Sequence, residues 1–285
     1  MKYISTRGGA GYKAASGAIL KGIASDGGLY VPEAMPKLEM PLKNLIDLSY
    51  QGLAYEILKI FLTDFDGGVL KNCVEKAYGS NFDTDLIAPL VKNGAGYFLE
   101  LFHGRTLAFK DMALSILPYL MAAAAKENNL GKKIVILTAT SGDTGKAALE
   151  GFKDVEGTSI IVFYPKGGVS EIQKKQMLTT GGSNTFVFGV TGNFDDTQTY
   201  VKQIFTDLPL AKKLDSNGYV FSSANSINIG RLLPQIAYYF YAYAQMVKNN
   251  YIAFGEGLNF TVPTGNFGNI LAGYYAKGLG LPIHK

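Results

Sequence analysis

The sequence predicts an α/β protein whose first third is mainly helical. From about residue 96 onward, short apolar runs alternate with amphipathic segments of helical spacing. This alternation is typical of βαβ units that build a parallel sheet. A chain of 285 residues is also long enough for about two domains. We therefore expect an N-terminal domain over residues 1–95 and an α/β region over residues 96–285.

The N-terminal region shows helical periodicity and lacks a glycine loop of the kind that binds phosphate. Helices are expected over residues 45–62 and 70–82, the second with Gly79 as its C-terminal cap, and a third short helix over 84–93. A mainly helical domain is the result.

The α/β region supplies the sheet. Runs 132–139 and 158–165 are continuously apolar, which indicates strands covered on both faces. Further strands are expected over 97–101 and 184–192. The helices between them are expected over 112–129 (with a proline inside), 146–154, 170–181 and 195–207.

The last segment, residues 258–278, predicts a strand, a glycine loop and a helix. A doubly wound domain would continue with more sheet. We therefore expect the α/β region to be incomplete at its C-terminus.

Composition excludes several classes of function. The net charge is only +4, and the basic residues are scattered, so nucleic-acid binding is not predicted. The single cysteine, Cys73, permits no disulfide within the chain and no thiolate zinc cluster, and its helical context predicts a buried role. The two histidines, His103 and His284, lie far apart in sequence. No metal site is predicted.

The most apolar segment is Leu232 to Val247. It contains Pro234, two glutamines and five aromatic residues, and it is shorter than the roughly 20 residues that span a bilayer. A core or subunit-interface helix is expected. The N-terminus has no apolar stretch of the signal-peptide kind. We expect a soluble, cytoplasmic protein without a membrane partner, of undetermined oligomeric state.

Two loops carry chemical groups between an apolar run and a helix. In PTGNFGN (263–269), glycines and a helix start can bind an anion, or they can simply turn the chain. In TATSGDTGKAA (138–148), the phosphate-binding spacing G-x-x-x-x-G-K-[ST] fails at Thr140 and Ala147. Asp143 alone reads as a solvated acid of a first helical turn, and Lys146 is expected to be a surface lysine.

Lys110 is the most distinctive residue, because TLAFKDM (106–112) places it within an apolar run. It is either an exposed helix-start lysine or a desolvated one. Burial lowers the pKa of a lysine, and a neutral amine is the nucleophile of a Schiff base. An amine at one end of a site and an anion cradle at the other match pyridoxal 5'-phosphate (PLP).

Seven segments, in this order, resemble threonine synthases. They are STRGG, SDGGLYVP, FHGRTLAFKDM, ATSGDTG, VFYPKGGVSEIQKKQM, SSANSINIGRLLPQ and PTGNFGN, and they cover nearly the whole chain. The resemblance implies a fold type II PLP enzyme, similar to the tryptophan synthase β subunit, behind a threonine-synthase N-terminal domain. It also implies a lyase that converts O-phospho-L-homoserine and water to L-threonine and phosphate in threonine biosynthesis.

The resemblance also implies roles for particular residues. Lys110 would be the Schiff-base lysine and proton shuttle, and Asp143 would lie near the PLP ring hydroxyl. The PLP phosphate would be held by Gly265, Asn266, Phe267, Gly268 and Asn269. The substrate carboxylate would be held by Ser141, Gly142 and Thr144. The substrate phosphate would be held by Asn225, Ser226, Asn228 and Arg231.

The chain departs from the family pattern in two ways. Arg105 stands where the family usually has proline, and the chain is considerably shorter than these enzymes, whose partner for the pyridine nitrogen comes from the C-terminal part. Alternatives therefore stay open. One is another type II PLP lyase, such as a serine/threonine dehydratase or a sulfhydrylase. Another is a catalytically inactive threonine synthase-like fragment.

Overall fold

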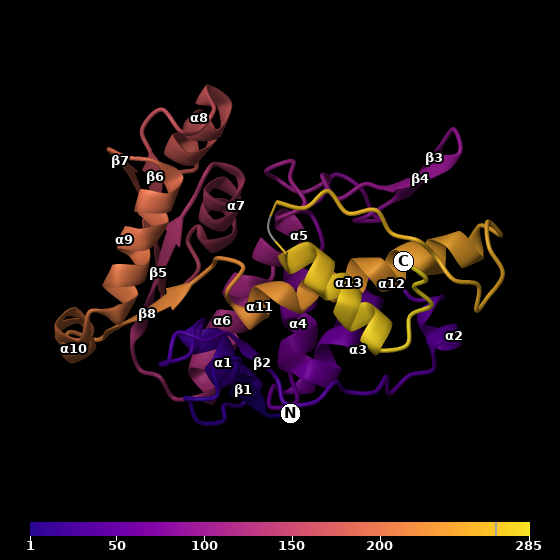
Figure 1. Cartoon of the computed structure of the whole chain (residues 1–285), viewed down its shortest axis with the longest axis horizontal. Helices are drawn as coiled ribbons and strands as arrows, with labels where there is room; N and C mark the ends of the chain where they lie inside the picture. The colour runs from indigo at the N-terminus through magenta and orange to yellow at the C-terminus, as the bar shows by residue number, and fades with distance from the viewer. Residues whose placement is uncertain (266) are drawn as a thin grey trace.

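The computed structural model describes residues 1–265 and 267–285. The sheet and its helices form one part of the molecule, and helices α2, α3 and α4 form the other together with α12 and α13, whereas α1 packs on α6 (Figure 1). The strands are β1 (Tyr3–Ser5), β2 (Tyr30–Pro32), β3 (Leu90–Asn93), β4 (Gly96–Leu99), β5 (Lys133–Ala139), β6 (Thr158–Pro165), β7 (Thr185–Val190) and β8 (Tyr219–Ser223).

Helices alternate with strands in the α/β region, as the sequence predicts, and other helices precede this region. They are α1 (Ala15–Lys21), α2 (Leu42–Leu45), α3 (Tyr50–Phe61), α4 (Gly67–Ala77), α5 (Asp111–Leu114), α6 (Leu117–Glu127), α7 (Asp143–Phe152), α8 (Glu171–Thr179), α9 (Phe194–Thr206), α10 (Leu208–Ser216), α11 (Ile229–Leu232), α12 (Pro234–Lys248) and α13 (Gly268–Gly278).

A parallel four-stranded sheet, in the order β7-β6-β5-β8, organises the α/β region. The central strand β5 is buried from Ile134 to Ala139, as its continuous apolar run predicts. Because parallel strands end at the same edge, the loops that follow β5 and β8 lie together. The Asn225 amide after β8 donates to the Ala139 carbonyl at the end of β5, at 3.2 Å.

Helix α12 is the centre of the helical part and is buried from Pro234 to Met246. Its polar side chains have partners: the Gln245 amide donates to the Ala88 carbonyl at 3.0 Å and accepts from the Leu90 N–H at 2.9 Å. The prediction of a core helix at 232–247 is thus confirmed. Among the described residues, no helix is both long and apolar enough to cross a membrane.

Two predicted elements are wrong. Residues 84–93 form no helix, because Leu90–Asn93 pairs antiparallel with Gly96–Leu99 across a turn in which Gly94 has a φ of 59°. Pro89 lacks the N–H that a continuing helix would need there. Residues 258–262 form no strand of the sheet; Leu258 makes a single bridge to Ile283, and the Phe260 N–H donates to the Lys285 carbonyl. The chain end is therefore the neighbour of this segment.

Smaller differences have local causes. The predicted helix 112–129 is two helices, because Pro118 starts a new first turn at α6. Helix α10 and strand β8 were not predicted. Cys73 is buried and free, as expected. The predicted domain boundary at residue 95 falls in the turn between β3 and β4, and the division into two domains stays a prediction.

Candidate active site

Lys110 stands immediately before helix α5, in a turn that a buried aspartate holds together. The Asp111 carboxylate accepts hydrogen bonds from the Thr106 N–H at 2.8 Å and the Thr106 hydroxyl at 2.6 Å. The Lys110 side chain is 16% exposed, and its ammonium lies 3.5 Å from Asp143 Oδ2 and 4.8 Å from the centre of the Phe109 ring. The expected desolvated lysine is therefore present, beside a carboxylate.

The surroundings lower the pKa of Lys110. Burial is the largest cause, because it disfavours the ammonium form. The Asp143 carboxylate opposes this shift, whereas the positive charges of Arg231 and Lys146 add to it. Lys110 consequently has a larger neutral fraction at a given pH than an exposed lysine has. A neutral amine can attack a carbonyl carbon.

Asp143 is the hub of the polar contacts around Lys110. Besides Lys110 it contacts the Lys146 ammonium at 3.2 Å and accepts from the Gln173 amide at 2.9 Å. Burial alone would raise the pKa of Asp143, but Gln173 and the two lysines outweigh burial and lower it. Asp143 thus stays ionised. The expectation that Lys146 is a surface residue is wrong: it is 8% exposed, because the Asp143 carboxylate draws it inward.

The loop after β5 is shaped by groups that sequence reasoning missed. The Thr140 hydroxyl oxygen accepts from the N–H groups of Gly142 and Gly145, at 2.9 and 2.8 Å. Gly142 has a φ of 140°, and a Cβ there would lie 2.3 Å from the Gln173 side chain. Gln173 also belongs to the capping box of α8, and its spacing from Ser170 was a visible signal. Ser141, Gly142 and Thr144 surround the start of α7, where an anion is favoured.

The glycine loop opens helix α13, as predicted. Its first-turn N–H groups have no acceptor within the helix. Gly268 lies beside Ser226, since a Cβ on it would be 3.6 Å from the Ser226 side chain. The side chain of Asn269 is turned toward α12, where its Oδ1 accepts from the hydroxyls of Tyr238 and Tyr239 at 2.6 and 2.8 Å. Its side-chain oxygen is thus engaged, whereas its backbone N–H lies in the first turn of α13, where an anion is favoured.

Three predicted residues of the phosphate loop remain: Gly265, Asn266 and Phe267. Gly265 and Phe267 are exposed, Phe267 to 76%. Asn266 lies outside the described residues.

Arg231 is buried, 4% exposed, and among the described residues no carboxylate lies within 4.0 Å of it. Its Nη1 donates to the Ala224 carbonyl at 2.8 Å. Burial lowers the pKa of Arg231 to about 10. Buried charges are normally paired, so an unpaired guanidinium beside Lys110 suits an anionic ligand.

Asn228, the remaining predicted phosphate ligand, is fully committed to the protein. Its amide donates to the carbonyls of Ile19 at 3.0 Å and Ser223 at 2.9 Å, and its oxygen accepts from the Gly230 N–H at 2.9 Å. It is completely buried. These contacts give Asn228 a structural role at the start of α11 and engage the side-chain groups that a phosphate ligand would need.

His103 fixes the segment that leads to Lys110 and makes stability depend on pH. Its ring nitrogens contact Asp83 at 2.6 Å and Glu100 at 2.9 Å. Burial would lower the pKa of His103, but the two carboxylates outweigh it and raise the pKa. The stabilisation is therefore complete below the unfolded value of about 6.5 and is lost as the pH rises through the folded pKa.

We expect His103→Gln to lower the thermal midpoint more at pH 6 than at pH 8.5, because glutamine cannot carry the positive charge. Thermal melts of both proteins across this range measure the difference. An equal loss at both pH values would show that the ion pairs do not contribute.

Comparisons with known proteins agree with the resemblance to threonine synthases. Residues 2–78 match the family model "Threonine synthase N terminus". The whole chain is 42% identical to a threonine synthase of Pseudomonas aeruginosa, and 95% of the chain is 42% identical to the human protein named threonine synthase-like 1. The PLP-bound threonine synthase of Brucella melitensis matches over the whole chain with a TM-score of 0.88 and 41% identity.

The class is thus an α/β protein of the fold type II kind, with the parallel sheet and helical N-terminal region described above. Its sequence and fold are similar to those of the matching part of threonine synthases. The chain spans about three fifths of the length of its bacterial relatives, 59% of the Pseudomonas and Brucella proteins, and 37% of the human one.

Proposed function

We propose that this chain binds PLP through Lys110 and takes part in converting O-phospho-L-homoserine and water to L-threonine and phosphate. The observation that carries the proposal is Lys110 itself: a largely buried amine of lowered pKa that contacts Asp143 and feels the positive charge of the buried Arg231. Names of the relatives support the reaction, and the PLP-bound Brucella structure supports the cofactor.

The residues present fit PLP. Lys110 Nζ would hold its aldehyde carbon, and the first turn of α13 offers N–H groups for its phosphate. Asp143, kept ionised by Gln173 and the two lysines, would orient Lys110 and accept from nearby donors. When bound, PLP supplies an electron-accepting ring that stabilises negative charge at the substrate Cα.

The other steps belong to side chains of this chain. Lys110 Nζ would accept the Cα proton and return protons later, since general acid–base groups must lie within hydrogen-bond reach. Ser141, Gly142 and Thr144 would bind the substrate carboxylate at the start of α7. Arg231, with Asn225 and Ser226, would bind the substrate phosphate and favour its departure as an anion.

A substrate comparison tests this function. Purified protein with PLP is given O-phospho-L-homoserine, L-serine or L-threonine, and phosphate and 2-oxo acid are measured. Phosphate release with threonine formation is the expected result. Oxo acid from serine or threonine without phosphate release would favour the alternative of a dehydratase-like lyase. No product from any substrate by a protein that holds PLP would favour the inactive alternative.

A further inference from the structure

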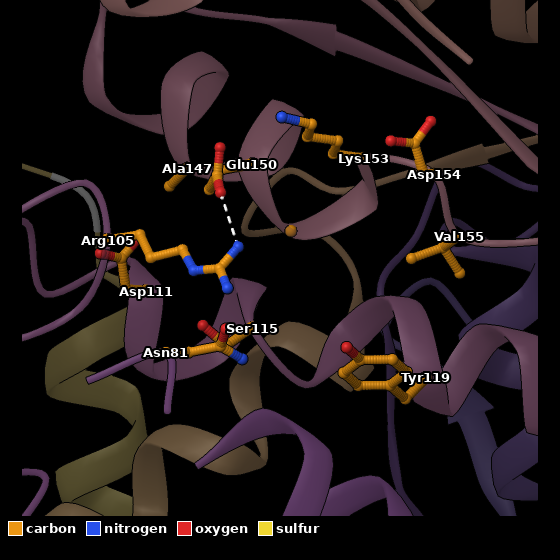
Figure 2. Close-up of a pocket in the computed structure, with 11 residues that line it drawn as sticks. Asn81, Arg105, Asp111, Ser115, Tyr119, Ala147, Glu150, Lys153, Asp154 and Val155 are labelled. Atoms are coloured by element: carbon orange, nitrogen blue, oxygen red, sulfur yellow. Dashed lines mark hydrogen bonds and ion pairs between the residues drawn. The ribbon is translucent and has the colours of Figure 1, made fainter. Parts of the chain in front are cut away.

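A polar cavity of about 270 Å³ lies outside the residues assigned to the proposed reaction (Figure 2). It opens between the end of α5, the first half of α6, one face of α7 and the turn that follows α7. Its volume is just below the roughly 300–1,000 Å³ typical of pockets for drug-sized ligands, so it suits a smaller metabolite. Lys110 does not line it.

Arg105 is the dominant group of this cavity. Figure 2 shows its guanidinium directed into the hollow, with Glu150 on one side and Ser115 and Asn81 on the other. Glu150 Oε1 accepts from a single nitrogen, Nη1, at 2.9 Å. A guanidinium can bind a carboxylate through two nitrogens, so Arg105 keeps donor capacity for a second acceptor.

The other polar groups of the cavity differ in whether they already make hydrogen bonds within the protein. Both carboxylate oxygens of Asp111 accept hydrogen bonds from Thr106, and Asp154 accepts one from the Ser183 N–H at 2.9 Å. Within the described part of the chain, the Ser115 and Tyr119 hydroxyls and the second oxygen of Glu150 have no hydrogen bond. The cavity therefore offers donors for a carboxylate and an acceptor for an ammonium group.

At the far end of the cavity, Val155 adds an apolar wall beside the charged side chains of Lys153 and Asp154. In Figure 2, Val155 lies opposite Arg105, with its methyl groups toward the hollow. A dianion such as phosphate would face the carboxylates of Glu150 and Asp154 and gain nothing from Val155. A molecule with a carboxylate, an ammonium group and a short aliphatic part matches all three features.

The geometry points to a second binding site here, for a small zwitterionic amino acid whose carboxylate pairs with Arg105 and whose ammonium faces Glu150. The site has a route to Lys110: Arg105 directly precedes Thr106, which Asp111 holds, and Lys110 lies between them in the same turn. A ligand on Arg105 would thus hold the turn that carries Lys110. L-Threonine is the first probe, a choice that rests on the proposed function.

Calorimetric titration of the full chain without PLP tests the proposal. L-Threonine is expected to bind, and L-threonine amide, which lacks the carboxylate, is expected to bind at least roughly tenfold more weakly, because charge-assisted pairs are the strong hydrogen bonds. Arg105→Gln should lose a similar factor. Arg7→Gln removes an exposed arginine elsewhere and should bind as the unaltered protein does.

Two further variants make the result decisive. Lys110→Ala should retain binding, so the site can stand even if the proposed function fails. Ser115→Ala should weaken binding without removing a charge, and it replaces Arg105→Gln if that variant does not fold. No heat at threonine concentrations up to about 10 mM, where even a millimolar Kd is visible, would overturn the proposal. Equal affinity of Arg105→Gln, or loss of binding in Lys110→Ala, would overturn it as well.

Discussion

Lys110→Ala is expected to lose all phosphate release from O-phospho-L-homoserine while keeping the fold. Lys110 is asked both to hold PLP covalently and to move protons, and proton transfer by a placed side chain alone is worth roughly 10²–10⁴ in rate. Its thermal midpoint should stay the same or rise slightly, since a largely buried ammonium with a single carboxylate contact is removed. Phosphate assays and thermal melts measure the two effects.

Matched variants separate chemistry from charge. Lys110→Arg keeps a cation near Asp143 but cannot form the covalent link, and it should be as inactive as Lys110→Ala. Lys126→Ala, an exposed lysine of α6, should be fully active. Threonine formation by pure Lys110→Ala protein would remove Lys110 from the proposed reaction.

Arg231→Leu is expected to separate function from stability. Arg231 is 4% exposed, and in the described chain no carboxylate within 4.0 Å neutralises its guanidinium, so the folded protein bears an uncompensated desolvation cost. Leucine removes this cost, and the thermal midpoint should not fall. The kcat/KM for O-phospho-L-homoserine should fall by roughly 10²-fold or more, because one buried charged donor to the substrate phosphate is lost.

Arg231→Lys provides the control, since it restores the charge without the planar fork and should recover part of the activity. Activity within a few-fold of the unaltered protein, together with a lower thermal midpoint, would contradict the assignment. Arg231 would then serve only to hold the Ala224 carbonyl.

The strongest periodic signals in the sequence predicted the fold well. The apolar runs at 132–139 and 158–165 form the two inner strands of the sheet; β5 is buried on both faces, whereas buried and half-buried residues alternate along most of β6. The prediction of a helix over 84–93 was wrong because helical spacing over a few residues cannot show whether a neighbouring strand is available to pair with them. Residues Leu90 to Asn93 pair as a strand with Gly96 to Leu99. Residues 258–262 pair with no strand of the parallel sheet.

The candidate site was predicted at its motifs and missed between them. Lys110 and Asp143 lie together, as the resemblance to threonine synthases implied, whereas the local pattern alone indicated a solvated Asp143. Lys146 was misjudged because its inward position depends on a carboxylate three residues earlier, which a surface helix could equally carry. Thr140 and Gln173 act through contacts across the fold, which spacing alone cannot show.

Mapping the site of PLP attachment tests the central claim most directly. The purified chain is mixed with PLP, and its visible absorbance is recorded. The product is then reduced with borohydride and digested, and the tagged peptide is identified by mass spectrometry. The structure predicts one reduced tag, on Lys110, whose amine is largely buried and has a lowered pKa. A tag on Lys146 or spread over exposed lysines, or no tag on a folded protein, would contradict the claim that Lys110 anchors the cofactor.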